Sequence, residues 1–257
     1  MIHRMAVFCW AVWSFAPFSN AGLPFLSHLA GDHELPLPWG VAIDAFNMEQ
    51  PYEIQDLSFR ARNGLELPLV DGIEVQNEVT HFDFKVDAWL LPFLNLFAIV
   101  GDLDGTTDVR IPPLPLPVPL ERVTVQYDGL VYGGGAVLVV GGNHWFATVT
   151  TTFSKTDLSG DFESTVKALT LQPRVGYPFK HVQVWVGGMF LDAQEKHKGA
   201  LELPGIGLVD FEVALSEKEA WNSTVGGNIV FSKHWQLTLD AGFGDRDTLL
   251  GTLNFRF

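Results

Sequence analysis

Cysteine is almost absent from this chain of 257 residues, which contains only Cys9. Cys9 lies in an apolar run, Ala6 to Phe18, that follows a short basic start and precedes Ser19-Asn20-Ala21. This pattern predicts a secretory signal over residues 1–21 that is removed on export. A membrane anchor is the alternative, but the run is shorter than the roughly 20 residues that span a bilayer. The mature chain would then have no disulfide and no cysteine nucleophile or metal ligand.

Basic residues are also scarce. The chain has 16 Lys and Arg against 30 Asp and Glu, and its formal net charge is −14. We therefore expect no nucleic-acid partner, because binding to phosphates needs a basic surface. The mean hydropathy is nevertheless positive, at +0.17. A chain that is both acidic and apolar must arrange its apolar residues in a pattern.

Long hydrophobic runs are missing beyond the signal. The most apolar stretch, Ala88 to Gly101, is short and is interrupted by Pro92 and Asn95. It does not predict a transmembrane helix. For an exported chain without such a helix, a closed β-barrel is the remaining way to satisfy every backbone amide in lipid.

Alternation with a period of two is what the sequence does contain. Several segments put apolar side chains on one face and mostly Thr, Asn, Gln, Gly and single charges on the other. Each is about as long as the roughly 9–11 residues of a tilted membrane strand. They are 39–46, 82–90, 145–154, 169–177, 182–190, 221–231, 235–244 and 248–257. Residues 129–140 are glycine-rich and apolar on both faces, so their orientation is ambiguous.

The connections alternate between short and long. Short turns are expected at 92–95, 141–144, 178–181 and 232–234, and longer polar loops at 103–122, 155–164 and 192–218. Such alternation is typical of periplasmic turns and extracellular loops. Counting back from the C-terminus predicts ten strands. Eight or twelve remain possible, because 52–62 and 73–79 could form another hairpin.

The last ten residues, Thr248 to Phe257, form an amphipathic segment that ends on an aromatic. This segment resembles the closing strand of Gram-negative outer-membrane β-barrels, whose terminal Phe is read by the assembly machinery. The resemblance implies an all-β, closed antiparallel up-and-down transmembrane barrel over 39–257, preceded by a periplasmic segment, 22–38. It also implies a location in the cell outer membrane. The implied partners are outer-membrane lipid, lipopolysaccharide and, through the C-terminal strand, the barrel-assembly machinery. A secreted β-sandwich or lipocalin-like barrel is the alternative, and it would turn its apolar face inward.

Charged residues on the polar faces are the candidate lumen-lining set. Inside a narrow barrel they must pair or stay wet, because an unpaired buried ion costs several kcal/mol. They form either a structural network or a polar path for a small solute. The set is Asp83, Lys85, Asp87, Arg174, Asp240 and Arg256.

Aromatic and histidine residues at strand ends are the candidate interfacial set. Three turns repeat a histidine, and the histidines belong to separate hairpins, so we expect anchoring at the membrane surface and no metal site. The set is His144, Trp145, His181, Trp221, His234, Trp235 and Phe257.

Other features are less specific. Gly101 to Asp108 resembles a calcium loop but lacks the closing bidentate acid, so we expect an acidic turn and no metal or other cofactor. The proline-rich segment 111–120 cannot join a ladder and is expected to be an exposed loop or to fold over the barrel mouth. His197, and His81 beside Asp83, are the candidates for catalysis, but no catalytic motif accompanies them.

Function is less well determined than architecture. The leading hypothesis is a transporter or channel for a small or hydrophobic solute, with a narrow polar lumen. An envelope-structural or adhesion barrel is the alternative. An enzyme that acts on lipid or peptide comes last, and we do not expect one.

Overall fold

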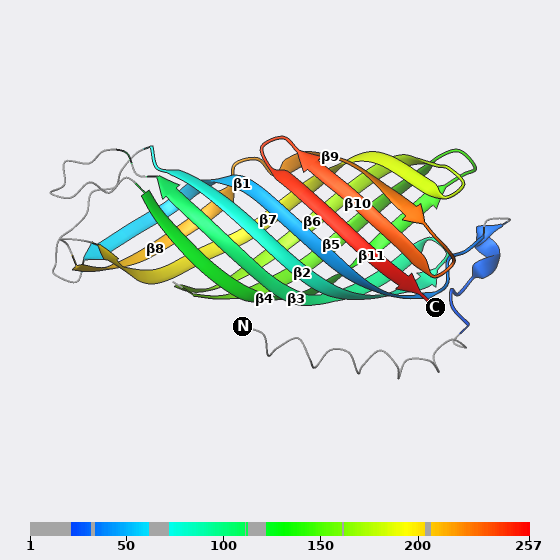
Figure 1. Ribbon diagram of the computed structural model, residues 1–257, viewed down its shortest axis with the longest axis horizontal. Coiled ribbons are helices and arrows are strands. Elements are labelled where there is room, and N and C mark those ends of the chain that lie inside the picture. Colours follow the sequence, from blue (N-terminus) through cyan, green and yellow to red (C-terminus); the bar gives the residue numbers. More distant parts are fainter. Residues whose placement is uncertain are drawn as a thin grey trace.

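The computed structural model describes residues 22–31, 34–61, 72–110, 112, 122–160, 162–203 and 207–257. The expected signal, 1–21, and all of the proline-rich segment except Pro112 lie outside these residues. A short 3-10 helix, η4 (Ser27–Ala30), precedes a barrel of long strands (Figure 1). The strands are β1 (Trp39–Ala61), β2 (Glu74–Leu91), β3 (Leu94–Arg110), β4 (Arg122–Gly141), β5 (Phe146–Gly160), β6 (Phe162–Pro178), β7 (Val182–Leu203), β8 (Gly207–Glu217), β9 (Trp221–Val230), β10 (Trp235–Phe243) and β11 (Asp247–Arg256). Among the described residues, no helix is long and apolar enough to cross a bilayer.

The sheet closes on itself, because β11 pairs with β1 from Gly40↔Arg256 to Glu49↔Asp247. All neighbouring strands are antiparallel. β8 and β9 both run alongside β7, one after the other, and are separated only by residues 218–220. They form a single pass interrupted once. The predicted closed antiparallel barrel of ten strands is therefore confirmed.

Several predicted connections are strands in the structure. Residues 52–61 and 74–79 extend β1 and β2, so the additional hairpin considered for this region is wrong. Loops were expected at 103–122, 155–164 and 192–218, but most residues of these ranges belong to strands. The acidic stretch 101–108, expected to be a turn, lies inside β3. On β2 the outward residues of the extension, Glu74, Gln76 and Glu78, are polar, and for this reason the segment resembled a loop.

The distribution of apolar side chains reverses along β2. Near the end where Trp39 and Phe257 lie, which we call the short-turn end, β2 exposes Phe82, Phe84 and Val86 and encloses Asp83, Lys85 and Asp87. Toward the opposite, far end, the same strand exposes Glu74, Gln76 and Glu78 and buries Val75 and Val79. The outer surface of the near section is therefore suited to contact with lipid, whereas the outer surface of the far section is suited to contact with water.

Exposed aromatic residues gather at two levels of the near section. The first level, at the short-turn end, contains Trp145, Tyr177 and Trp235. The second level lies farther along the barrel axis, toward the far end, and contains Phe82, Phe153, Trp221 and Phe243. Phe153 is eight residues from Trp145 on the same face, which is about 26 Å along a strand. A tilt of about 40° reduces this to roughly 20 Å, close to the roughly 25 Å apolar band of outer-membrane barrels.

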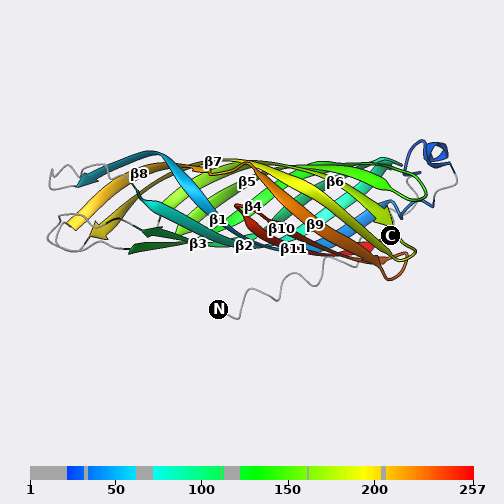
Figure 2. The same ribbon diagram turned by 90° about the horizontal axis from the view of Figure 1, so that it is seen from above.

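The barrel narrows from ten strands to eight between its two sections. The near part of β1, Gly40–Glu49, pairs with β11, whereas its far part, Tyr52–Ala61, pairs directly with β8. The β10–β11 hairpin ends part way along the barrel, and beyond it β8 takes its place beside β1 (Figures 1 and 2). Arg246, at the tip of this hairpin, is 2% exposed and donates to the backbone carbonyl oxygen of Glu219 at 2.9 Å. It therefore ties the hairpin to the segment that joins β8 and β9.

The glycine-rich part of β4 is paired on both sides without interruption, with β3 along Leu94–Arg110 and with β5 along Phe146–Gly160. Its orientation is now defined, because Leu130, Tyr132 and Leu138 point outward and Val131 and Val137 line the lumen. There is no opening in the wall at 129–141.

Candidate functional site: the barrel lumen

The lumen holds a cavity of about 510 Å³ that extends from Asn95 and Arg256 near the short-turn end to Leu158 and Ala193 in the far section. Described residues of every strand except β8 contribute to its lining. Of the six predicted lumen residues, Asp83, Lys85, Asp87, Arg174 and Arg256 line the cavity. Asp240 is buried beside Arg174 and does not itself line the cavity.

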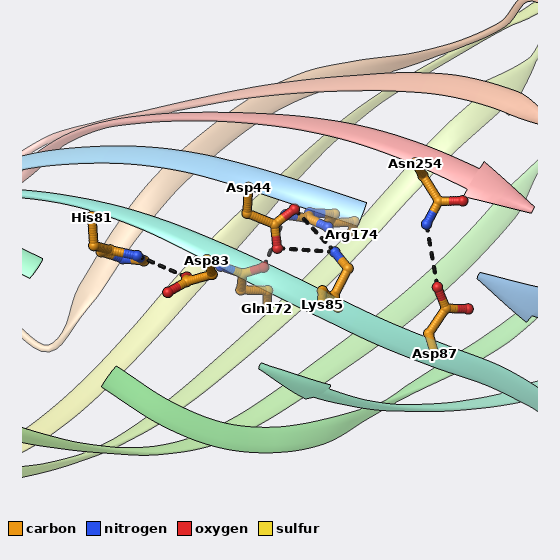
Figure 3. Close-up of polar contacts among 8 residues, drawn as sticks. All are labelled: Asp44, His81, Asp83, Lys85, Asp87, Gln172, Arg174 and Asn254. Carbon is orange, nitrogen blue, oxygen red and sulfur yellow. Dashed lines mark hydrogen bonds and ion pairs between the residues drawn. The ribbon is translucent and has the colours of Figure 1, made fainter. Parts of the chain in front are cut away.

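Asp87 is the centre of a cluster at the short-turn end. Its Oδ1 accepts hydrogen bonds from Arg256 Nη2 at 2.9 Å and from Asn95 Nδ2 at 2.6 Å. Its Oδ2 accepts one from Asn254 Nδ2 at 3.2 Å (Figure 3). Asp87 is only 6% exposed, so these donors replace the water that the carboxylate loses on burial. These hydrogen bonds link β11 to β2 and β3.

A second cluster joins β6, β7 and β10. Asp240 Oδ2 accepts from Trp185 Nε1 at 2.7 Å and lies 3.2 Å from Arg174 Nη2. Arg174 also donates to Gln172 Oε1 at 2.9 Å, and its guanidinium carbon lies 5.3 Å from the centre of the Trp185 ring. Arg174 is thus held on one side by a carboxylate and on another by an aromatic face.

Lys85 of β2 pairs with Asp44 of β1 at 3.1 Å, and both face the cavity (Figure 3). Lys85 on β2 and Arg174 on β6 both line the cavity, and β3, β4 and β5 lie between their strands in the sheet. Sequence reasoning missed Asp44, although it lies on the polar face of the first predicted strand. Applying the same alternation to that strand would have found it.

His81 and Asp83 mark the upper end of the charged section. His81 Nδ1 lies 2.8 Å from Asp83 Oδ2, and the imidazole packs against the Phe46 ring with a centroid distance of 4.7 Å. In the described part of the barrel, Asp44, Asp87 and Asp240 each lie next to a Lys or Arg, and Asp83 has only this histidine. His197, the other catalytic candidate, lies in β7, but its side chain is outside the described residues.

Beyond His81 the lining of the lumen becomes mostly apolar, with polar exceptions such as Asn77 and Thr156. Val125 of β4 and Leu158 of β5 form the centre of a buried cluster, and Leu103, Val123, Tyr127 and Val166 pack around it. An eight-stranded barrel has an interior just wide enough for side chains to fill. In the far section these side chains occupy the part of the lumen next to β3, β4, β5 and β6.

The predicted interfacial residues lie on the outer wall or in the turns. His144, His181 and His234 occupy three separate turns at the short-turn end. The His144 ring lies 6.3 Å from the Tyr177 ring, and the His234 ring stacks on Phe255 at 5.6 Å. Trp221 lies at the other level, at the start of β9, against Phe190. Phe257 packs near Phe255 and pairs with the backbone of Trp39.

The near section, apolar outside and charged inside, defines the class of protein. A soluble barrel would turn these faces the other way. The chain is therefore a transmembrane β-barrel of the outer-membrane type. The short-turn end is the end expected to face the periplasm, because outer-membrane barrels have short periplasmic turns.

Comparison with known proteins finds outer-membrane proteins among the solved structures. No protein-family model matches the chain, and no curated protein matches it either. Solved structures similar to it include the translocator domain of the autotransporter NalP from Neisseria meningitidis, with 10% identity, a TM-score of 0.43 and coverage of 88% of this chain and 90% of that one. The outer membrane protein OprG from Pseudomonas aeruginosa has 10% identity, a TM-score of 0.48 and coverage of 87% and 98%. The COG4313 outer membrane channel from Pseudomonas putida F1 has 12% identity, a TM-score of 0.39 and coverage of 88% and 98%. At these identities the likeness concerns the fold alone.

Proposed function

We propose that this protein transports a small, largely apolar molecule with one polar group across the outer membrane. The observation that carries this proposal is the cavity of about 510 Å³, whose lining changes from charged side chains to apolar ones along the barrel axis. This volume lies within the roughly 300–1,000 Å³ of small-molecule sites, which are mostly apolar with a few polar groups that orient the ligand. Lys85 and Arg174 are two of the three described Lys and Arg side chains that line the cavity, and they would meet such a polar group.

The apolar cluster around Val125 and Leu158 argues against a wide aqueous pore. We expect the resting barrel to conduct few ions, and passage through the far section to require side-chain rearrangement. The transported molecule would therefore partition into the cavity first. This places the specificity in the cavity lining and not in the diameter of an open channel.

Uptake into liposomes that contain the refolded barrel tests the proposal. Small aromatic alcohols and carboxylates are suitable solutes, because each joins an apolar body to one polar group. The Lys85→Ala/Arg174→Ala double variant should lose selectivity for the carboxylate, while Lys180→Ala/Lys233→Ala, in the periplasmic turns, should behave as wild type. Absence of solute flux through the wild-type barrel, with planar-bilayer conductance also absent, would set the transport function aside.

The strand extensions above the apolar band favour a second candidate, a surface-binding barrel. Transport alone does not require the outer wall to continue as paired strand to Ala61, Leu203 and Arg110. Residues 192–218, the predicted loop, belong to this wall, so their deletion would open the barrel. Substituting outward acids such as Glu78 and Asp104 leaves the pairing intact and is the better test of binding to a partner cell or surface.

A further inference from the structure

A groove of about 440 Å³ lies on the outer wall, across β4, β5, β6 and β7. Phe153 and Leu169 lie opposite each other in its floor, and Lys155 and Lys167 lie opposite each other directly above them. Tyr132 flanks Lys155 on β4. The groove therefore crosses the upper border of the apolar band, with apolar side chains below the border and two cations above it.

The two lysines have different surroundings. Lys155 Nζ lies 2.7 Å from Asp157 Oδ1 and 2.8 Å from the Tyr132 hydroxyl. Lys167 forms no ion pair with any side chain that the structure describes, and Asp192 lies at the edge of the groove, opposite Leu169. Like charges directly opposite each other on neighbouring strands repel. An anion seated between the two ammonium groups would remove that repulsion.

On β11, β1, β2, β3 and β4 the same border carries acidic residues. Asp247, Glu49 and Glu78 are direct neighbours across β11, β1 and β2, and all three are exposed. Asp104 and Asp128 face each other across β3 and β4. An anionic headgroup at this depth is therefore repelled by β11 to β4 and attracted to β5 and β6.

We propose that this groove binds a phosphorylated acyl lipid of the outer leaflet, with a phosphate between Lys155 and Lys167 and acyl chains along Phe153 and Leu169. Phe153 is 62% exposed at hydrocarbon depth, so only a molecule that is itself in the bilayer reaches both parts of the groove. A free anion would contact the lysines alone. The site lies outside the lumen and is independent of the transport function.

This site can be tested by native mass spectrometry of the full barrel. The protein is incubated in detergent with bisphosphorylated lipid A, and the bound lipid is measured after the detergent is removed in the spectrometer. Lys155→Gln/Lys167→Gln should weaken binding at least tenfold, and Lys155→Arg/Lys167→Arg should bind as wild type. Phe153→Ala should weaken binding severalfold. Lys180→Gln/Lys233→Gln removes two cations at the other membrane surface and should change affinity less than twofold.

Two further arms identify the ligand. Dephosphorylated lipid A should bind at least tenfold more weakly than the phosphorylated form, and inorganic phosphate at millimolar concentration should not displace the lipid. Equal binding by the Gln double variant, equal binding of the dephosphorylated lipid, or displacement by phosphate would each overturn the proposal. Heat-modifiable gel migration establishes that every variant is folded.

Discussion

Arg256 and Asp87 are joined by a hydrogen bond of 2.9 Å, although 169 positions separate them and β1 lies between their strands. Arg256 also donates to the carbonyl oxygen of Leu37 at 2.8 Å, just before β1 begins. The Arg256 side chain thus contacts both the segment that leads into β1 and the inner face of β2. The ion pair reinforces the β1–β11 ladder that closes the barrel.

Asp87→Asn should destabilise the barrel by roughly 3–5 kcal/mol, because it leaves the Arg256 guanidinium buried without an anion. Asp87→Asn/Arg256→Gln should cost less than Asp87→Asn alone. Urea unfolding in phospholipid vesicles, followed by tryptophan fluorescence, measures both. Glu74→Gln is the control, since its ion pair with Arg110 is exposed and should contribute less than about 1 kcal/mol. A single variant as stable as wild type would contradict the assigned role.

Trp185→Phe should cost roughly 1–3 kcal/mol, because Asp240 loses a donor at 2.7 Å while remaining buried. The same change should loosen Arg174, which packs over the Trp185 ring. Urea unfolding gives the stability, and carboxylate uptake reports the position of Arg174. Trp221→Phe, on the lipid-facing wall, serves as the control and should leave uptake unchanged. Wild-type uptake and stability in Trp185→Phe would show that this ring does not position Arg174.

Gly105→Val should destabilise the far section by roughly 1–3 kcal/mol, because a side chain there would enter the space of the Tyr127 ring. Tyr127 would be displaced from Asn77, whose Oδ1 accepts its hydroxyl at 2.6 Å. Hydrogen exchange of β3 and β4 amides should increase mainly beyond residue 101. Gly251→Ala is the matched control, as its nearest new contact is 3.7 Å. Unchanged exchange in Gly105→Val would contradict the packing described for this section.

Arg122→Gln should raise the pKa of Asp108 toward its ordinary value of 3.8, because the hydrogen bond from Arg122 is the main cause of its lowered pKa. Thr124 contributes a second hydrogen bond at 2.6 Å. A folded-state pKa below the unfolded value means that the stabilisation is present above pH 3.8 and is lost as pH falls through the lowered pKa. Carboxyl carbon NMR titration of Asp108 measures the change. An unchanged Asp108 titration would exclude Arg122 as its cause.

The faces of the membrane strands were predictable from residue order, because strand geometry alternates side chains regardless of what pairs with the strand. Asp83, Lys85 and Asp87 therefore could be assigned to the inside from β2 alone. The far extensions were not predictable in the same way. Polar outward residues such as Glu74 and Gln76 are typical of exposed loops as well as of strands in water, and the buried Val75 and Val79 between them are too few to distinguish the two.

The sequence by itself favoured a transmembrane β-barrel, predicted ten strands with eight or twelve as alternatives, and indicated which face the membrane strands turn to lipid. These expectations follow from local alternation, because side chains on a strand point to opposite faces in turn. Only the tertiary structure decided that β8 pairs with β1 beyond the β10–β11 hairpin, that the barrel narrows to eight strands, and that Arg256 reaches Asp87. These contacts join residues far apart in the chain, and alternation along one strand carries no information about which strand lies beside it.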